Sequence, residues 1–392
     1  MEKLKHLEGL RGLAAFLVFF HHIRLLFYVN SFESLDQTIG TSSLPKFIQT
    51  YFIELKNTLT DGTLFVWVFW ILSAYVLCIK LFKNVSNTEN SPVLFESFIK
   101  RYIRLFVPIT VSVILSITLY RLGLFHNKEA AKILAEIGYN SNWLGGFGDF
   151  KYDLSDFFNL IFYGIYFDYY LYPTYNPVLW SIQSEFIGSM FIFGLFGIIK
   201  SHKNRFYIYF TLIFVLFYMK SLNYIPFVFG FLLSDLDFTK IQKKSVVKFK
   251  RIEEKIFHFK WFSLLVFFIL LILTKLIVAH FQGDIAYVYI IQSLLILYFS
   301  IKNSLIKQFL SLKWIYIFGK ISFSFYLIHM LVIYTFTSFL ITKSISFEFK
   351  ILNVILTFTL SVLVSIPYYL YIDKFAIYVS KKFANLFLTK NL

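Results

Sequence analysis

The chain has little reactive chemistry and little charge. Of its 392 residues only one is a cysteine, Cys78, which excludes disulfide bonds, a paired-thiol redox centre and a zinc site built from thiolates. The chain contains no His-Glu-x-x-His sequence, and no Gly-Lys-Ser/Thr follows the glycines of residues 145–148, so the motifs of a zinc hydrolase and of a phosphate-binding loop are missing. The eight histidines are scattered. We therefore expect no metal site.

Charged residues make up 15% of the chain, whereas a soluble globular protein carries about 25%. Apolar residues account for 58%, and 52 residues are phenylalanine. Crossing a bilayer takes about 20 mostly apolar residues. Ten segments come close to this length, namely 7–29, 62–81, 102–123, 178–199, 206–219, 225–236, 261–279, 285–301, 321–341 and 351–372. Because the alternation of barrel strands is missing, the sequence predicts an all-α fold, a polytopic transmembrane helical bundle forming a single integral-membrane domain over residues 1–392.

Basic residues outnumber acidic ones by 38 to 22. In a soluble protein this excess would suggest nucleic acid, but in a membrane protein Lys and Arg mark the cytosolic loops. If both termini lie in the cytosol, the inner segments hold roughly three times as many basic residues as the outer ones. The pattern predicts ten passes through the cytoplasmic membrane with both termini cytosolic, a cytosolic loop at 240–260 and a long outer loop at 124–176. The lipid bilayer is thus an expected partner and nucleic acid is not.

The first predicted span carries ionisable residues on one face. At 100° per residue, Arg11 and His22 differ by about 20° around a helix and lie about 16 Å apart along its axis. Ionisable residues inside a bilayer are functional candidates because they are costly to place there. Glu8 lies one turn from Arg11, so the alternative is an interfacial ion pair with a structural histidine. His21 is turned roughly 80° away from His22, and we interpret it as structural.

A carboxylate is expected at the depth of His22. The fourth predicted span begins NPVLWSIQSE, and Glu185 lies about 10–12 Å from its outer end. Counted from the opposite side of the membrane, His22 reaches a similar depth, so the two side chains are predicted to pair. In the alternative, Glu185 only packs against its neighbours Trp180, Ser181 and Ser184 through hydrogen bonds.

Two further stripes of polar residues lie on predicted spans. Arg101 and Arg104 share a face at the expected cytosolic start of the third span, and arginine side chains suit phosphates, although charges that only set topology are the alternative. Ser322, Tyr326 and His329 share a face of the ninth span at i, i+4 and i+7. Such a stripe serves helix packing more often than a binding site.

Five sequence segments, in order, resemble acyltransferase family 3, a family of polytopic membrane enzymes that transfer acyl groups from acyl-coenzyme A to sugars and other extracytoplasmic acceptors. LEGLRGLAAFLVFFHH is similar to the first-span motif, an arginine separated by ten residues from a histidine, which selects His22 over His21. The others are FWILSAYVL, FIKRYIRLFVP, LWSIQSE and FGKISFSFYLIH. The chain departs from the family pattern at three positions. Ala74 stands where glycine is usual, Asp373 where glutamate is common, and Phe375 where a proline often follows that glutamate.

The resemblance implies an O-acyltransferase that uses cytosolic acyl-coenzyme A, with acetyl the usual group, to modify a hydroxyl of an extracytoplasmic sugar, polysaccharide or glycolipid. His22 is then either the general base for the acceptor hydroxyl or a nucleophile that carries the acyl group. The expected catalytic residues are His22, Arg11 and Glu185. The expected donor-binding residues are Arg101, Arg104, Ser73, Ser322, Tyr326 and His329.

Two other functions compete with acyl transfer. Arg11, His22 and Glu185 are also the residue types of a relay in a proton-coupled secondary transporter or a lipid flippase. However, the spans show no two-half symmetry, and 16 glycines and 7 prolines leave few broken helices of the kind transporters use. An inert membrane scaffold would leave the intramembrane arginine and histidine without a role.

Overall fold

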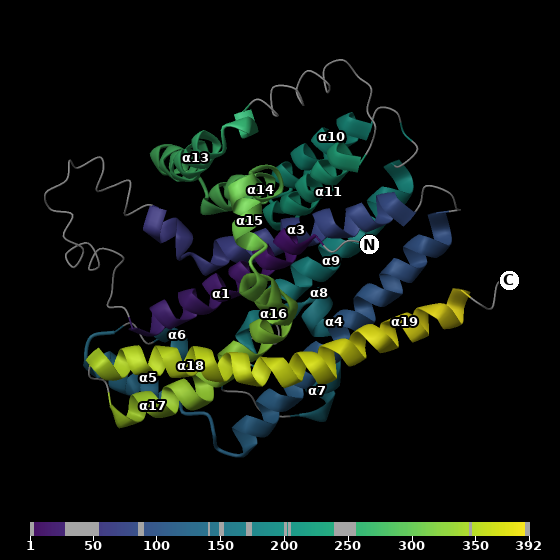
Figure 1. The fold of residues 1–392 in the computed structure, drawn as a ribbon. Helices are drawn as coiled ribbons and strands as arrows, with labels where there is room; N and C mark the ends of the chain where they lie inside the picture. Colours follow the sequence, from purple (N-terminus) through teal and green to yellow (C-terminus); the bar gives the residue numbers. More distant parts are fainter. Residues whose placement is uncertain are drawn as a thin grey trace, which may run out of the picture. The chain divides into compact units, whose positions relative to one another are not determined.

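The structure is a computed structural model that describes residues 4–27, 55–84, 90–139, 142–148, 153–169, 175–199, 202, 205–238, 256–344 and 347–388. These residues form helices joined by short turns and contain no β-strand (Figure 1). The prediction of an all-α fold is confirmed for the described part of the chain. Most of the predicted cytosolic loop at 240–260 lies outside the described residues.

Eight helical stretches in the described ranges are long and apolar enough to cross a membrane. They are Lys5–Phe27, Gly62–Phe82, Val93–Arg121, Pro177–Ile199, Lys260–Val278, Ile285–Lys302, Lys313–Lys343 and Phe349–Leu386. The two remaining predicted spans are helices of 14 residues each, α10 (Arg205–Tyr218) and α11 (Ile225–Phe238). The protein is an integral membrane protein, whereas the number of passes and the side of the termini stay predictions.

Several helices extend beyond the apolar segments that predicted them. Helix α4 spans Asn90–Arg121, so it begins well before the expected start of the third span at residue 102. Helix α18 (Phe347–Pro367) continues through a π-helical stretch, η6 (Tyr368–Asp373), into α19 (Lys374–Leu388), which Figure 1 shows as one long rod. Hydropathy marks only the apolar part of a helix, and polar turns at either end escape it.

The described residues group into two compact units, each assembled from segments far apart in the sequence. The first draws on Met1–Leu17, Ser42–Phe95 and Gly188–Lys320, and the second on Val18–Thr41, Glu96–Ile187 and Ile321–Leu392. Helices α1 (Lys5–Phe27), α4, α9 (Trp180–Ile199) and α16 (Lys313–Val332) contribute residues to both units.

In the first unit, glycines bring helices into backbone contact. A Cβ added to Gly12 of α1 would lie 2.7 Å from the amide nitrogen of Gly319 and 2.9 Å from its Cα, on α16. A Cβ on Gly319 would in turn overlap the carbonyl oxygen of Glu8, and one on Gly9 would overlap that of Leu310. The glycines of the LEGLRG segment therefore let α1 approach the start of α16 closely.

Helix α3 (Gly62–Asn84) packs closely against α11 in the same unit. A Cβ on Gly230 of α11 would lie 2.5 Å from the carbonyl oxygen of Ile71 and 2.8 Å from the Cβ of Ala74. Ala74 has no exposed surface. The alanine at position 74 is thus matched by a glycine on the facing helix, which explains how its methyl group fits there.

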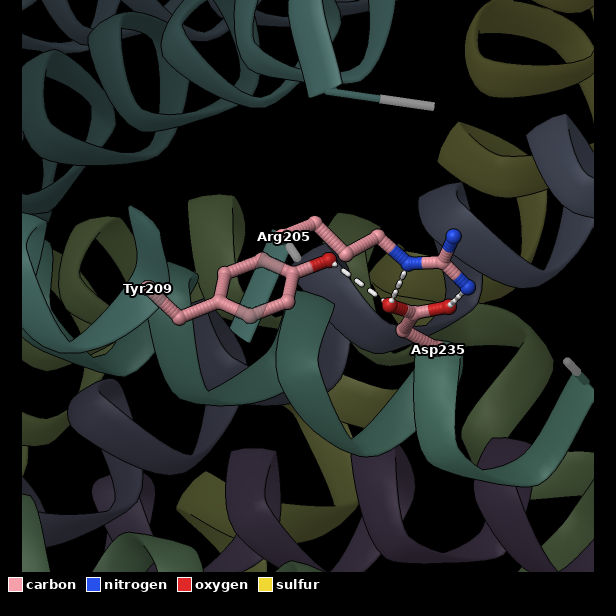
Figure 2. A network of polar contacts seen from close by, with 3 residues as sticks. All are labelled: Arg205, Tyr209 and Asp235. Carbon is pink, nitrogen blue, oxygen red and sulfur yellow. Dashed lines mark hydrogen bonds and ion pairs between the residues drawn. The ribbon is translucent and has the colours of Figure 1, made fainter. Parts of the chain in front are cut away.

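Two carboxylates near the end of α11 hold its neighbours, and one of them, Asp235, is buried. Asp235 has no exposed surface and accepts hydrogen bonds from Arg205 of α10 at 2.5 and 2.8 Å and from the Tyr209 hydroxyl at 3.0 Å (Figure 2). Asp237 accepts from Tyr75 of α3 at 2.8 Å and from Lys302 at 3.0 Å. These contacts tie α10 and α3 to one turn of α11.

In the second unit, part of the predicted outer loop at 124–176 is helical. It contains α5 (Asn127–Glu136), α6 (Asn142–Gly145), α7 (Leu154–Asn159), η1 (Leu160–Gly164) and α8 (Ile165–Phe167). The His126 amide donates to the Tyr334 carbonyl at 3.0 Å, and Lys350 donates to the Tyr139 hydroxyl at 2.6 Å. This segment is therefore folded against α17 (Ser338–Lys343) and its neighbours.

Candidate active site

Two histidines from distant parts of the chain meet in the second unit. Nδ1 of His22, near the end of α1, lies 3.0 Å from Nε2 of His329, near the end of α16. His329 has no exposed surface, whereas His22 is partly exposed. The sequence marked both residues separately but did not predict that they form a pair.

The backbone of α16 holds His329 in place. Its Nδ1 lies 3.1 Å from the carbonyl oxygen of Phe325, one turn earlier on the helix. The ring of Phe325 stacks on the His329 ring with centroids 5.8 Å apart, and Phe19 of α1 meets the same ring edge-on at 6.2 Å. Because packing and a hydrogen bond both fix this imidazole, it is a rigid partner for His22.

Trp143 lies against the other histidine. Its ring is nearly parallel to that of His22, with centroids 5.6 Å apart and an interplanar angle of 13°. Trp143 belongs to the short helix α6, in the predicted outer loop. No local signal in the sequence links this tryptophan to a residue 121 positions earlier in the chain, since the contact depends on how the loop folds.

The start of α9 is fastened to α16 next to the histidine pair. The Tyr326 hydroxyl lies 2.8 Å from the Ser181 hydroxyl and donates to the Val178 carbonyl at 3.1 Å. Asn176 donates to the Leu327 carbonyl at 2.9 Å. Burial raises the pKa of the Tyr169 phenol, which therefore stays protonated and donates to the Asn176 carbonyl at 2.8 Å. Tyr326 thus has a clear structural role.

Glu185 forms an ion pair with Arg101 of α4. The prediction that Glu185 pairs with His22 is therefore wrong, since the ring nitrogen that His22 engages is on His329. The error came from the depth estimates, which placed Arg101 at the membrane edge because the third span was expected to begin at residue 102. Helix α4 begins at Asn90, so Arg101 lies about 16 Å along a helix and reaches a carboxylate of α9.

The remaining predicted site residues are divided between the two units. In the second unit, Arg104 is exposed on α4 and Ser322 is buried on α16. Arg11 and Ser73 belong to the first unit, where Ser73 is buried and Arg11 pairs with Glu8 at 3.1 Å. The ion pair at the start of α1, considered above as an alternative for Arg11, is therefore present.

A comparison with protein families identifies the chain. The family model described as an acyltransferase domain, that of acyltransferase family 3, matches residues 4–370. The chain belongs to acyltransferase family 3. No match was found among curated proteins or among solved structures. The match covers both units, and membership of a membrane acyltransferase family disfavours the transporter and scaffold alternatives.

Within this acyltransferase the histidine pair is the best candidate for the reacting centre. An imidazole is the side chain whose unperturbed pKa lies closest to neutral pH, which suits it to moving a proton during acyl transfer. His22 is partly exposed, is held by His329 on one side, and is stacked by Trp143. Asp373 and Phe375, the departures near the chain end, lie in η6 and α19.

Proposed function

We propose that this acyltransferase moves an acyl group, with acetyl as the first choice, from cytosolic acyl-coenzyme A to a hydroxyl of an extracytoplasmic sugar, polysaccharide or glycolipid, through one membrane domain spanning residues 1–392. The observation that carries the proposal is the His22 imidazole, hydrogen-bonded to His329 and stacked on Trp143. This ring is the histidine of the first-span motif, and it is ordered without being fully buried.

The chemistry assigned to His22 is general base catalysis. Its free ring nitrogen takes the proton from the acceptor hydroxyl as that oxygen attacks the thioester carbonyl carbon. The carbon–sulfur bond then breaks, and the departing coenzyme A thiolate receives the proton back from the imidazolium. A covalent acyl-histidine is the other route: the same nitrogen attacks the thioester and expels the coenzyme A thiolate, and the acceptor oxygen then takes the acyl group and releases the imidazole.

The donor is assigned to the basic side chains of α4 in the second unit. Arg104 is exposed and suited to a phosphate, whereas Arg101 forms an ion pair with Glu185. Ser322, in the same unit, stays in the proposal as a donor contact. The catalytic role predicted for Arg11 and the donor-binding role predicted for Ser73, both in the first unit, stay separate predictions. Each of these roles needs a binding experiment.

The acceptor is assigned to the side that carries Trp143. This residue lies in the predicted outer loop, so its stacking on His22 supports access to the base from outside the cell. A flat aromatic ring next to a catalytic base also suits the apolar face of a sugar.

The test compares two neighbouring histidines. Membranes containing His22→Gln or His21→Gln are supplied with radiolabelled acetyl-coenzyme A, and the label is followed into the envelope fraction, with mass spectrometry of surface glycans and lipids in parallel. We expect His22→Gln to lower transfer by about 10²–10⁴-fold, the usual contribution of a positioned base. His21→Gln should keep most activity. Loss in His21→Gln alone, with equal amounts of both proteins in the membrane, would refute the assignment of His22.

A further inference from the structure

In the hydrogen bond between His22 and His329, the proton belongs to one of the two ring nitrogens. A backbone contact of α16 determines which one. Nδ1 of His329 lies 3.1 Å from the carbonyl oxygen of Phe325. A carbonyl oxygen only accepts hydrogen bonds, so Nδ1 of His329 must carry a proton and donate it. This assignment fixes one of the two ring nitrogens of His329.

The second nitrogen follows from burial. His329 has no exposed surface, and its ring is packed against the aromatic rings of Phe325 and Phe19. A charged ring in such surroundings would lose its hydration. Its hydrogen-bond partners in the described part of the chain are the Phe325 carbonyl and the His22 ring, neither of which is an anion, so the neutral ring is the stable form. A neutral imidazole protonated at Nδ1 has a lone pair at Nε2 and can only accept there.

The proton between the rings therefore belongs to His22. Its Nδ1 lies 3.0 Å from Nε2 of His329 and must be the donor. A neutral His22 with its proton on Nδ1 has its lone pair on Nε2, the nitrogen on the far side of the ring from His329. The chain of contacts from the Phe325 carbonyl through His329 thus selects one tautomer of His22.

We propose that His329 is a positioning residue that holds His22 as the tautomer with an unprotonated Nε2, the atom available to take a proton. The inference rests on the proposed function of His22 as the base. It changes the role expected for His329 from binding the donor to orienting the base. Trp143 adds a second constraint, because stacking on His22 limits rotation of its ring.

The arrangement also serves the charged intermediate of the reaction. When Nε2 of His22 has accepted the acceptor's proton, the imidazolium still donates from Nδ1 to His329, and a bond from a charged donor is stronger than one from a neutral donor. Without His329 the proton of neutral His22 can occupy either nitrogen, and one of the two tautomers presents no lone pair at Nε2.

Two substitutions separate this role from simple packing. His329→Leu fills similar space but has no acceptor, and we expect it to lower kcat by about 10–100-fold, the usual effect of removing the partner that orients a functional histidine. The KM for acetyl-coenzyme A should change little. His329→Gln supplies an amide oxygen that can accept from His22, so it should recover most of the lost kcat. Equal kcat in His329→Leu and the unmodified protein would overturn the inference.

A spectroscopic measurement tests the tautomer directly in the unmodified protein, and the His22→Gln variant serves only to assign the signals. In full-length protein labelled with ¹⁵N-histidine and reconstituted in bilayers, the signals of His22 are identified by their absence in His22→Gln. We expect Nδ1 of His22 to be protonated and Nε2 to be unprotonated, with His329 protonated at Nδ1. A proton found on Nε2 of His22 would overturn the inference.

The same measurements keep the two proposals apart. If His22→Gln abolishes transfer while Nε2 of His22 proves protonated in the resting protein, the base survives and the role of His329 fails. If His22→Gln retains full transfer, the proposed base fails, and with it the positioning role, whatever the tautomer. Transfer lost in His22→Gln, with the expected tautomer and the recovery in His329→Gln, supports both.

Discussion

The close contact of α1 with the start of α16 makes Gly12→Ala a sharp test of the fold. The added Cβ would lie 2.7 Å from the Gly319 nitrogen and 2.9 Å from its Cα, whereas ordinary contacts of a Cβ begin near 3.4 Å. Both opposing atoms belong to the backbone, so no side chain can rotate away, and the helices must separate by about 0.5–0.7 Å. A gap of this size forfeits roughly a quarter to a half of the dispersion energy of the facing atoms.

We expect Gly12→Ala to lower the free energy of unfolding by about 2–3 kcal/mol, the upper part of the range for overpacked sites. The assay is unfolding by SDS titration in mixed micelles. The matched control is Gly194→Ala on α9, where an added Cβ would meet nothing within 4 Å, and its stability should stay within about 0.5 kcal/mol of the unmodified protein. If both alanine variants are equally stable, the reasoning from backbone contact is wrong.

The double variant adds a second check. Gly319→Ala should be destabilising for the same reason, because its Cβ would overlap the carbonyl oxygen of Glu8. Once α1 and α16 have been pushed apart by one methyl group, the second methyl group meets less resistance. The cost of Gly12→Ala with Gly319→Ala should therefore be smaller than the sum of the single costs. If the two single costs simply add in the double variant, the two sites do not share one interface.

Three further predictions concern charge. Arg104→Gln should raise the KM for acetyl-coenzyme A with little change in kcat, since a remote phosphate contact contributes uniform binding, and an unchanged KM would leave Arg104 with a role in topology only. Arg101→Gln should mainly destabilise the protein, because Glu185 loses its ion-pair partner. Asp235→Asn should lower the free energy of unfolding by about 3–5 kcal/mol, because Arg205 loses its buried anionic partner, and adding Arg205→Met should restore part of the loss. SDS unfolding of the unmodified protein, the single variant and the double variant measures both effects. A double variant less stable than Asp235→Asn would contradict the prediction. A reporter fused to the carboxyl terminus should be active only in the cytosol, and activity outside the cell would contradict the topology inferred from the basic loops.

Hydropathy predicted the fold well because the signal is local. Each of the ten apolar segments coincides with a helix over its described residues, since a long apolar run can satisfy its backbone in lipid only as a helix. Boundaries were less accurate, as α4 shows, because the polar turns at Asn90 and beyond carry no apolar signal. The resemblance to acyltransferase family 3, which rested on five ordered segments, is confirmed.

Contacts between distant residues could not be predicted in this way. The helix faces and estimated depths of His22 and Glu185 predicted that they pair, but the Glu185 carboxylate forms its ion pair with Arg101. The true partner of His22 lies 307 residues away on α16, and spacing within one helix cannot show which other helix faces it. The stripe of serine, tyrosine and histidine on α16 did mark His329 as a polar residue in an apolar helix. This is a feature of the sequence, among those considered above, that pointed to His329 as a functional residue.

The Asp235 carboxylate has a consequence for how the protein is made. Helices α10 and α11 have 14 residues each, about 21 Å at 1.5 Å per residue, which is short of a hydrocarbon layer of about 30 Å. During synthesis Asp235 emerges from the ribosome 30 residues after Arg205, the cation that will neutralise it. Entering the bilayer alone, α11 would carry an acidic charge at a cost of about 2.5–3.5 kcal/mol. We therefore expect the translocon to retain α10 until α11 has been made and to release the two as a hairpin, already joined by their ion pair.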